Sequence, residues 1–195
     1  MSDNLRIVVA ITGASGAIYG ERALCALSDL GIETHLVVSK SGARTLQEER
    51  GLSLADISAK ANVVHSASDI GAAIASGSFR HRGMLVAPCS VRTMSEIATG
   101  VTSSLVSRAA DVTLKERRPL VLMVRETPFH LGHLRTMTQL SEMGAIIAPP
   151  LPAFYAGVDS VDGLVDQSVG RALDLLGLDW PNVKRWGESI GPSTD

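Results

Sequence analysis

Cysteine, aromatic side chains and excess charge are all scarce in this sequence. Only two of its 195 residues are cysteines, Cys25 and Cys89, which is too few for a disulfide framework and gives no metal-ligand spacing. We therefore expect no metal site and a reducing, cytoplasmic location. Aromatic residues make up 4% of the chain, so the core has to be built from Val, Ile, Leu, Ala and Met.

The balance of charge excludes further classes of protein. Lys and Arg number 18 against 20 Asp and Glu, a net charge of −2, which argues against nucleic acid or an anionic membrane surface as partner. No apolar run approaches the ~20 residues of a transmembrane helix. The N-terminus lacks the layout of a signal peptide, because Gly and Ser interrupt its apolar run early.

Short apolar runs rich in β-branched residues alternate along the chain with helical patterns. Continuous runs of this kind are typical of strands buried on both faces of a parallel sheet. We expect strands at 7–12, 34–39, 62–65, 83–88, 120–124 and 145–149, and helices at 17–30, 90–99, 103–117, 131–143 and 160–176. The alternation predicts one α/β domain over residues 1–178, an open sheet with helices on both faces, followed by a C-terminal arm over 179–195.

The first predicted strand ends in a glycine-rich turn, Gly13-Ala14-Ser15-Gly16. Ligands of open α/β sheets bind beyond the carboxyl ends of the strands. Ser15 can cap the following helix, whose free N–H groups favour an anion. The G-x-x-G spacing falls short of the dinucleotide fingerprint, and Ser39 stands where a ribose-binding acid is usual. Both departures argue against NAD and leave FMN open, although this stretch alone fits a merely tight turn equally well.

Polar residues also follow the fourth and fifth predicted strands. Ser90 and Thr93 offer hydroxyls and amides at a helix start, a second anion site. Cys89 has no histidine near it in sequence, so we expect a small buried residue rather than a nucleophile. Arg125 can hold an anion or a carbonyl-bearing ring, and Glu126 can act as acid or base if desolvated; the alternative is a surface ion pair between them.

The later part of the chain offers groups for a second phosphate. Arg108 and Lys115 belong to a basic run that would usually form a solvated helix face, and that can alternatively hold a phosphate-bearing substrate. Tyr155 follows the sixth predicted strand, and Arg171 lies on the next helix. A tyrosine hydroxyl and an arginine can clamp one phosphate.

Taken together, these segments resemble the UbiX flavin prenyltransferases, a family that includes partner subunits of aromatic-acid decarboxylases. The resemblance covers nearly the whole chain and is carried by TGASGAIYG, ASGSF, APCSVRTMSEIATG, SRAADVTLKERRPLVLMVRETP, GAIIAPPLPAFY and VGRALDLLG. It implies a three-layer, flavodoxin-like Rossmann sheet, bound FMN, no metal, and a homododecamer built from trimers. It also implies that the dimethylallyl group of dimethylallyl phosphate is joined to N5 and C6 of reduced FMN, making prenylated FMN for a UbiD-type decarboxylase.

The resemblance also assigns roles to residues. For FMN it implies a set of turn and helix-start residues with one arginine: Gly13, Ala14, Ser15, Ser39, Ser90, Val91, Arg92, Thr93 and Arg125. For the prenyl phosphate it implies Tyr155 and Arg171, helped by Lys115 and Arg108, with Trp186 matching a C-terminal tryptophan that closes over the site. Ser15, Glu49 and Glu126 match catalytic groups, and Lys115 stabilises the leaving phosphate. The chain departs from the family pattern at Ser103-Ser104 and at 156–160, and both departures bear on the prenyl site.

Two other functions fit the same sheet. The first is an FMN-dependent cysteine-type decarboxylase, but the stretch PCSVRT replaces the PASANT-like stretch of those enzymes, and no histidine stands clearly in the catalytic place. The second is a non-catalytic flavin carrier subunit. A NAD dehydrogenase ranks last, for want of the third glycine and the ribose acid.

Overall fold

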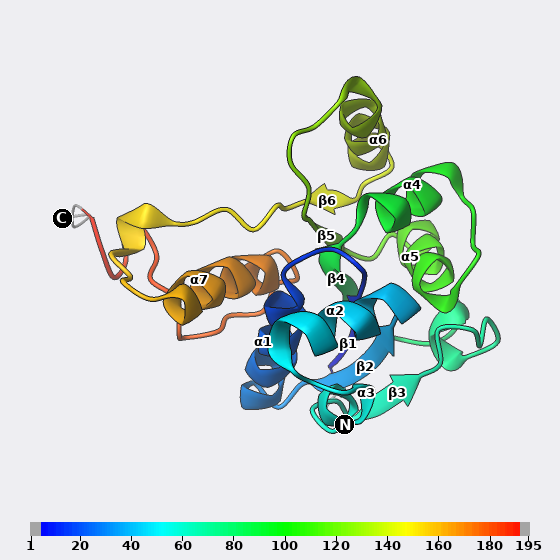
Figure 1. Cartoon of the computed structure of the whole chain (residues 1–195), viewed down its shortest axis with the longest axis horizontal. Coiled ribbons are helices and arrows are strands. Elements are labelled where there is room, and N and C mark those ends of the chain that lie inside the picture. Colours follow the sequence, from blue (N-terminus) through cyan, green and yellow to red (C-terminus); the bar gives the residue numbers. More distant parts are fainter. Residues whose placement is uncertain (1–4, 192–195) are drawn as a thin grey trace.

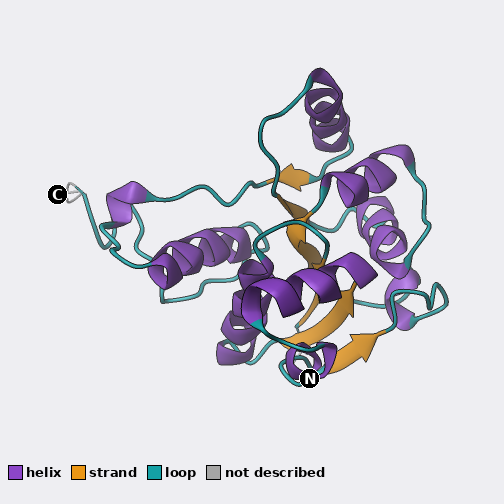
Figure 2. Cartoon of the chain, viewed as in Figure 1, coloured by secondary structure: helices purple, strands orange, loops and turns teal. Residues whose placement is uncertain are grey.

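The computed structural model describes residues 5–191, and these form an open parallel sheet between two layers of helices (Figure 1, Figure 2). Six strands lie in the order β3-β2-β1-β4-β5-β6, and every neighbouring pair is parallel. Their bounds are β1 (Arg6–Ile11), β2 (Glu33–Val38), β3 (Val63–His65), β4 (Gly83–Cys89), β5 (Leu120–Val124) and β6 (Ile146–Ile147). The chain winds outward from β1 to β3 and returns to β4 beside β1, so the two halves of this Rossmann-type sheet meet at β1 and β4.

The helices of the described chain fall on both faces, which confirms the predicted fold class. They are α1 (Ala17–Asp29), α2 (Lys40–Arg50), α3 (Leu54–Ser58), α4 (Val91–Thr99), α5 (Leu105–Lys115), α6 (Leu131–Glu142) and α7 (Val161–Asp174), with two 3₁₀ turns, η1 (Ala73–Ala75) and η2 (Phe154–Ala156). All six strands and five of the helices lie where the sequence predicts them. The helices α2 and α3 were not predicted.

Alternate residues of β1 divide the core into two clusters. Ile7, Val9 and Ile11 face the cluster that contains α1 and α7, whereas Val8 and Ala10 face the one that contains α4 and α5. All five are fully buried, and each larger side chain contributes about 1.5–3 kcal/mol to the free energy of unfolding. Both faces of the sheet are therefore closed, and the strand ends remain as the place for a ligand.

An extended segment leaves β6 and carries the chain away from the sheet towards α7 (Figure 1). Large apolar side chains on this segment and near it are exposed, among them Leu151 (73%) and Phe154 (81%). Beyond α7 the chain turns back along that helix, with Trp180 and Val183 buried against it. We call residues 179–191 the arm. The division into a domain over 1–178 and an arm over 179–195 stays a prediction, and residues 192–195 lie outside the described part.

No helix among residues 5–191 is long and apolar enough to cross a membrane.

Candidate functional site

A buried threonine joins the turns that follow β1 and β4. The Thr12 hydroxyl donates a hydrogen bond to the Pro88 carbonyl (2.7 Å) and accepts one from the Ser90 N–H (2.9 Å). The Arg125 N–H, just beyond β5, donates to the Cys89 carbonyl (3.1 Å). Three strand ends that the sequence singled out are thus held together at one edge of the sheet.

The turn after β1 is built differently from the prediction. Gly16 occupies the N-cap position of α1 in a left-handed conformation, with φ of +105°. Because this residue is a glycine, it has no side chain that could cap the helix. The prediction that Ser15 caps this helix is therefore wrong, because a serine cap needs to occupy that position in an extended conformation. Instead the Glu49 carboxylate, from α2, accepts hydrogen bonds from the N–H groups of Gly16 (2.9 Å) and Ala17 (2.9 Å).

Glu49 also accepts a hydrogen bond from the Ser15 side chain. Partial burial by itself raises the pKa of Glu49, but the hydrogen bonds from Ser15, Gly16 and Ala17 and the nearby charge of Arg125 outweigh it, so that the pKa of Glu49 lies below its ordinary value. Glu49 is therefore an anion at neutral pH and fixes the Ser15 hydroxyl. The sequence resemblance identified Glu49, but not this contact.

A groove of about 530 Å³ lies beside this turn, in front of the first turns of α2 and α4. Six of its lining residues were predicted to hold the flavin: Gly13, Ser39, Ser90, Val91, Arg92 and Thr93. The other eight were not: Lys40, Ser41, Ala67, Ser68, Glu96, Ser103, Ser104 and Val106. Ser39 and Ser90 cap the two helices, because their hydroxyls accept hydrogen bonds from the N–H groups of Gly42 (3.0 Å) and Thr93 (3.3 Å). First-turn N–H groups lack intrahelical partners, so two partly positive helix ends face one groove.

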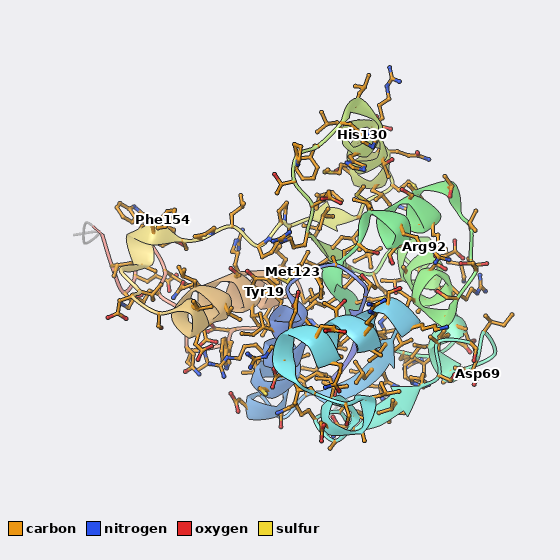
Figure 3. The ribbon with its side chains drawn as sticks, in the orientation of Figure 1. Tyr19, Asp69, Arg92, Met123, His130 and Phe154 are labelled. Carbon is orange, nitrogen blue, oxygen red and sulfur yellow. The ribbon has the colours of Figure 1, made fainter. Side chains whose placement is uncertain are left out.

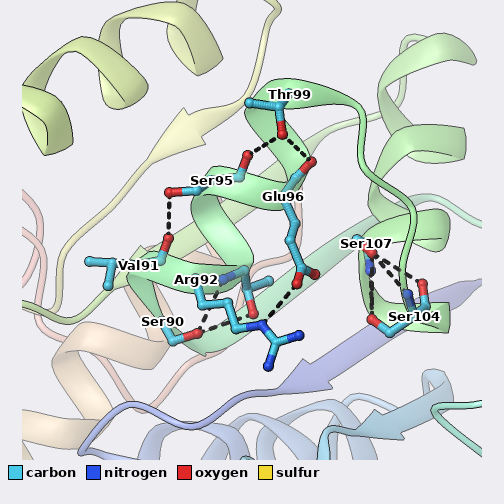
Figure 4. A network of polar contacts seen from close by, with 9 residues as sticks. Ser90, Val91, Arg92, Ser95, Glu96, Thr99, Ser104 and Ser107 are labelled. Atoms are coloured by element: carbon cyan, nitrogen blue, oxygen red, sulfur yellow. Dashed lines mark hydrogen bonds and ion pairs between the residues drawn. The ribbon is translucent and has the colours of Figure 1, made fainter.

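Figure 4 shows the side chains around the first turn of α4. The Ser90 hydroxyl donates to the Thr93 hydroxyl (3.1 Å), and the Arg92 guanidinium donates to Glu96 (2.9 Å). Arg92 is largely exposed whereas Glu96 is mostly covered, so the arginine is held over the groove by its carboxylate partner.

Arg125 extends over the turn after β1. Its Cγ lies 3.9 Å from the position that a Cβ on Gly16 would take. Its charge acts on Glu49 and on Tyr19, whose pKa is nonetheless raised because burial outweighs the charge. Glu126 is half-buried and accepts a hydrogen bond from the Thr127 N–H (2.9 Å). Arg125 and Glu126 form no ion pair in the described structure, so both remain available to a ligand.

Gly13 explains how closely α2 approaches the turn. A Cβ on Gly13 would lie 2.3 Å from the Cβ of Ser41. Only a glycine allows the first turn of α2 to pass this near to the end of β1. The groove depends on that approach, because Ser39, Lys40 and Ser41 of its lining come from α2 or its cap.

A second pocket, of about 290 Å³, lies between the extended segment after β6, α7 and the arm. It brings together Tyr155, Arg171 and Trp186, which the sequence assigned to one ligand. The rings of Tyr155 and Trp186 meet edge to face with their centres 5.9 Å apart. The Arg171 side chain is 69% exposed, as a binding group for an entering phosphate must be.

Lys115 and Arg108 do not join this pocket within one chain. Lys115 ends α5 beside Pro119, at the amino edge of the sheet, and is paired with Glu116. It lines a separate groove of about 730 Å³ with Arg117 and Arg118. Arg108 is paired with Asp111 (2.8 Å). The expectation that both help Tyr155 and Arg171 is therefore not met by the single chain, since the helix that carries them leads away from the strand ends.

The relative positions of the two sites can be followed in Figure 3, where Tyr19 and Met123 lie near the centre of the view, between Arg92 on one side and Phe154 on the other. Cys89, at the end of β4, is fully buried, and burial raises the pKa of its thiol to about 12. Its burial confirms the prediction of a small buried residue at this position. Among residues 5–191 no three His, Cys, Asp or Glu side chains are grouped to hold a metal.

Comparison with known proteins places this geometry in a family. The model of the flavoprotein family matches residues 1–173. A flavin prenyltransferase UbiX of Thauera aromatica is 54% identical over 182 residues, covering 93% of this chain and 94% of the relative. The structure of AnUbiX (PadA1) in complex with FMN and dimethylallyl pyrophosphate matches with a TM-score of 0.93 and 49% identity over 94% of this chain and 97% of that one. A dodecameric FMN-dependent UbiX-like decarboxylase from Escherichia coli O157:H7 matches with a TM-score of 0.91 and 45% identity, covering 93% and 99%.

Proposed function

This chain belongs to the flavoprotein family and is a flavin prenyltransferase of the UbiX type, and from that membership we propose which of its residues perform each part of the reaction. The substrates are FMN in its reduced form and dimethylallyl phosphate, whose dimethylallyl group is joined to N5 and C6 of the flavin. The observation that carries the assignment is the cluster of Ser15, Glu49 and Arg125 at the meeting point of the two sheet halves. A cysteine decarboxylase and a flavin carrier, the other functions that the sequence left open, do not agree with this membership.

The groove in front of α2 and α4 suits the phosphate end of FMN. Two helix N-termini and several serine hydroxyls converge on it, and such ends bind phosphate without a metal. Gly13, Ala14, Ser15, Ser39 and the run 90–93 surround the phosphate and ribityl chain in this proposal. Arg125 contacts the ring, because its side chain lies over the turn beside Ser15. Reduced FMN, when bound, supplies an electron-rich ring to which the allylic carbon is transferred.

Ser15 and Glu49 act as a pair in this proposal. The lowered pKa of Glu49 makes it a weak base, and its oxygens already accept hydrogen bonds from two N–H groups and one hydroxyl. We assign it the task of orienting Ser15, whose hydroxyl then meets the departing phosphate. The proton lost from C6 needs another acceptor, and Glu126 or the released phosphate takes it.

Tyr155 and Arg171 hold the prenyl phosphate, and Trp186 walls the pocket beside Tyr155. Negative charge grows on the phosphate as its bond to the allylic carbon breaks, so fixed cationic groups lower the barrier. Lys115 and Arg108 are suited to this task only from another copy of the chain. A homododecamer, the state of the Escherichia coli relative, supplies such a copy, and the exposed Leu151, Phe154 and Val161 favour assembly.

Mass spectrometry tests the function directly. The protein, mixed anaerobically with reduced FMN and dimethylallyl phosphate, is expected to release a flavin heavier by one prenyl unit. Glu126→Ala or Lys115→Ala is expected to bind FMN and make little product. Unmodified FMN as the only flavin, under verified reducing conditions, would refute the proposal, and equal product from both variants would refute the roles given to those residues.

The fate of the product is proposed from the family alone. We propose that prenylated FMN passes to a UbiD-type decarboxylase and that both proteins work in the cytoplasm. The two cysteines, without a disulfide framework, support a reducing compartment. Reconstitution of an apo decarboxylase with the released flavin is the corresponding measurement.

A further inference from the structure

Asp174, at the last turn of α7, lies between two arginines. Its Oδ1 accepts a hydrogen bond from Nη2 of Arg185 at 2.7 Å, whereas its Oδ2 is 3.7 Å from Nη1 of Arg171. Arg185 also contacts Asp179 at 2.8 Å, but that carboxylate is 87% exposed. The carboxylate of Asp174 is therefore neutralised chiefly by Arg185, and Arg171 is only loosely paired.

Arg185 is carried to this place by an arm that is fixed on both sides. The side-chain amide of Gln167, with its oxygen facing the Lys184 N–H, accepts from that group at 2.8 Å and donates to the Lys184 carbonyl at 3.2 Å. The Lys184 ammonium donates to the Ala156 carbonyl (2.9 Å), beside Tyr155. Val183 packs directly on Gly170, where a Cβ would lie 2.0 Å from the valine Cγ1. The arm is thus docked against α7 and the segment after β6, and together these three parts of the chain line the pocket.

The charge of Asp174 matters because Arg171 has to bind a dianion. A carboxylate one helical turn from Arg171 competes with phosphate for its guanidinium and repels the phosphate as well. A second guanidinium that holds the carboxylate removes both effects. We infer that Arg185 is a positioning residue for prenyl transfer: it engages Asp174 so that Arg171 stays free for the phosphate of the prenyl substrate. This inference rests on the proposed function, since it takes Arg171 as a phosphate ligand.

Binding without turnover is the suitable measurement. The full-length protein loaded with oxidised FMN, which does not react, is titrated with dimethylallyl phosphate in a calorimeter. Arg185→Ala is expected to raise the Kd roughly tenfold, the effect of weakening one charge-assisted hydrogen bond. The matched control is Arg22→Ala. Arg22 pairs with Asp166, which lies on α7 as Asp174 does, and the exposure of this pair is similar to that of Arg185 and Asp174. Arg22 lines a different pocket. The control is expected to leave the Kd within twofold of the parent.

A double variant separates charge from support of the arm. Asp174→Asn in the Arg185→Ala background removes the competing carboxylate, so the Kd is expected to return towards the parent value. A Kd unchanged in Arg185→Ala, or a double variant that binds no better than the single one, overturns the inference. Arg185→Lys, which keeps the charge, is expected to bind dimethylallyl phosphate nearly as well as the parent, even where Arg185→Ala is poorly folded. A tenfold loss of affinity in Arg185→Lys also contradicts the inference.

The experiments distinguish a failure of the proposed function from a failure of the inference about Arg185. If the function fails, the unsubstituted protein yields no prenylated flavin under reducing conditions, whatever its Kd for dimethylallyl phosphate. Product from the unsubstituted protein, with a Kd that does not respond to Arg185, refutes the inference alone.

Discussion

Glu49 joins the N-terminus of α1 to the hydroxyl of Ser15, so a single carboxylate has a structural task and, in our proposal, a functional one as well. Glu49→Gln is expected to lower the free energy of unfolding by about 1 kcal/mol at neutral pH, the value of a helix cap. This is the typical value for a cap and not the upper end of the range, because Glu49 is exposed to water. Prenyl transfer is expected to fall more steeply, since an amide holds the Ser15 hydroxyl less well.

The pH dependence of this stabilisation has a definite sign. The pKa of Glu49 is lowered in the folded chain, so its contribution is present above the unfolded pKa of about 4.3 and is lost as the pH falls through the lower folded value. Melting temperatures of the parent and Glu49→Gln are expected to differ most at neutral pH and to converge below about pH 4. A difference that stays constant through this range contradicts the assignment.

Gly13 is the residue on which the groove proposed for FMN depends. Gly13→Ala forces Ser41 away, because the new Cβ would lie 2.3 Å from the serine Cβ. We expect the variant to lose at least about tenfold in FMN affinity, measured by the flavin absorbance retained after gel filtration, as the N-terminus of α2 leaves the groove. Gly71→Ala is the control, since its nearest neighbour is an ordinary 3.5 Å contact; equal flavin retention in both variants would contradict this role.

The sequence predicted the strand ends and the polar residues on them, but not which contacts those residues make. Ser15 stood at a plausible cap position, and only the left-handed Gly16 together with Glu49, contributed from another helix, excludes that role. The meeting of Ser15 with Glu49 spans more than thirty positions of chain, and spacing carries no signal for it. The resemblance identified both residues without showing the contact.

At the scale of elements, the strands were predictable and α2 was not, for one physical reason. Four of the strands, β1, β2, β4 and β5, are largely apolar runs buried on both faces, which periodicity detects. In contrast, α2 buries only Gly42 and Leu46. That helix is specified by its ends, the Ser39 cap and the left-handed Gly51. The apolar stripe that reveals an amphipathic helix is absent from it.

The packing of the arm on α7 leads to a prediction at this scale. Gly170→Ala improves helix propensity by about 1 kcal/mol, yet its Cβ displaces Val183 and so detaches the arm. Trypsin is expected to cleave the variant after Lys184 or Arg185 at least several times faster than the parent, while the melting temperature changes little. Identical fragment patterns and rates by mass spectrometry would show that the arm accommodates the methyl group.

For the whole molecule, the two edges of the sheet carry different parts of the proposed site. Arg125 follows the carboxyl end of β5, whereas Lys115 precedes its amino end. Lys115→Ala and Arg171→Ala are each expected to be nearly inactive, but oligomers reassembled from an equal mixture are expected to regain about a quarter of the parent activity, because random pairing restores that share of sites. A mixture as inactive as its components would place both residues in the same subunit's site.

Under the proposal that Lys115 acts from a neighbouring copy of the chain, its place at the other edge of the sheet from Arg125 makes the activity depend on protein concentration. A newly made chain would then carry the groove proposed for FMN together with Tyr155 and Arg171, whereas Lys115 and Arg108 would come only from a neighbouring chain. At low protein concentration the chain would bind FMN without consuming dimethylallyl phosphate. Turnover would start once the concentration is high enough for the oligomer to assemble. Assembly would then serve as the on-switch, with no separate regulator required.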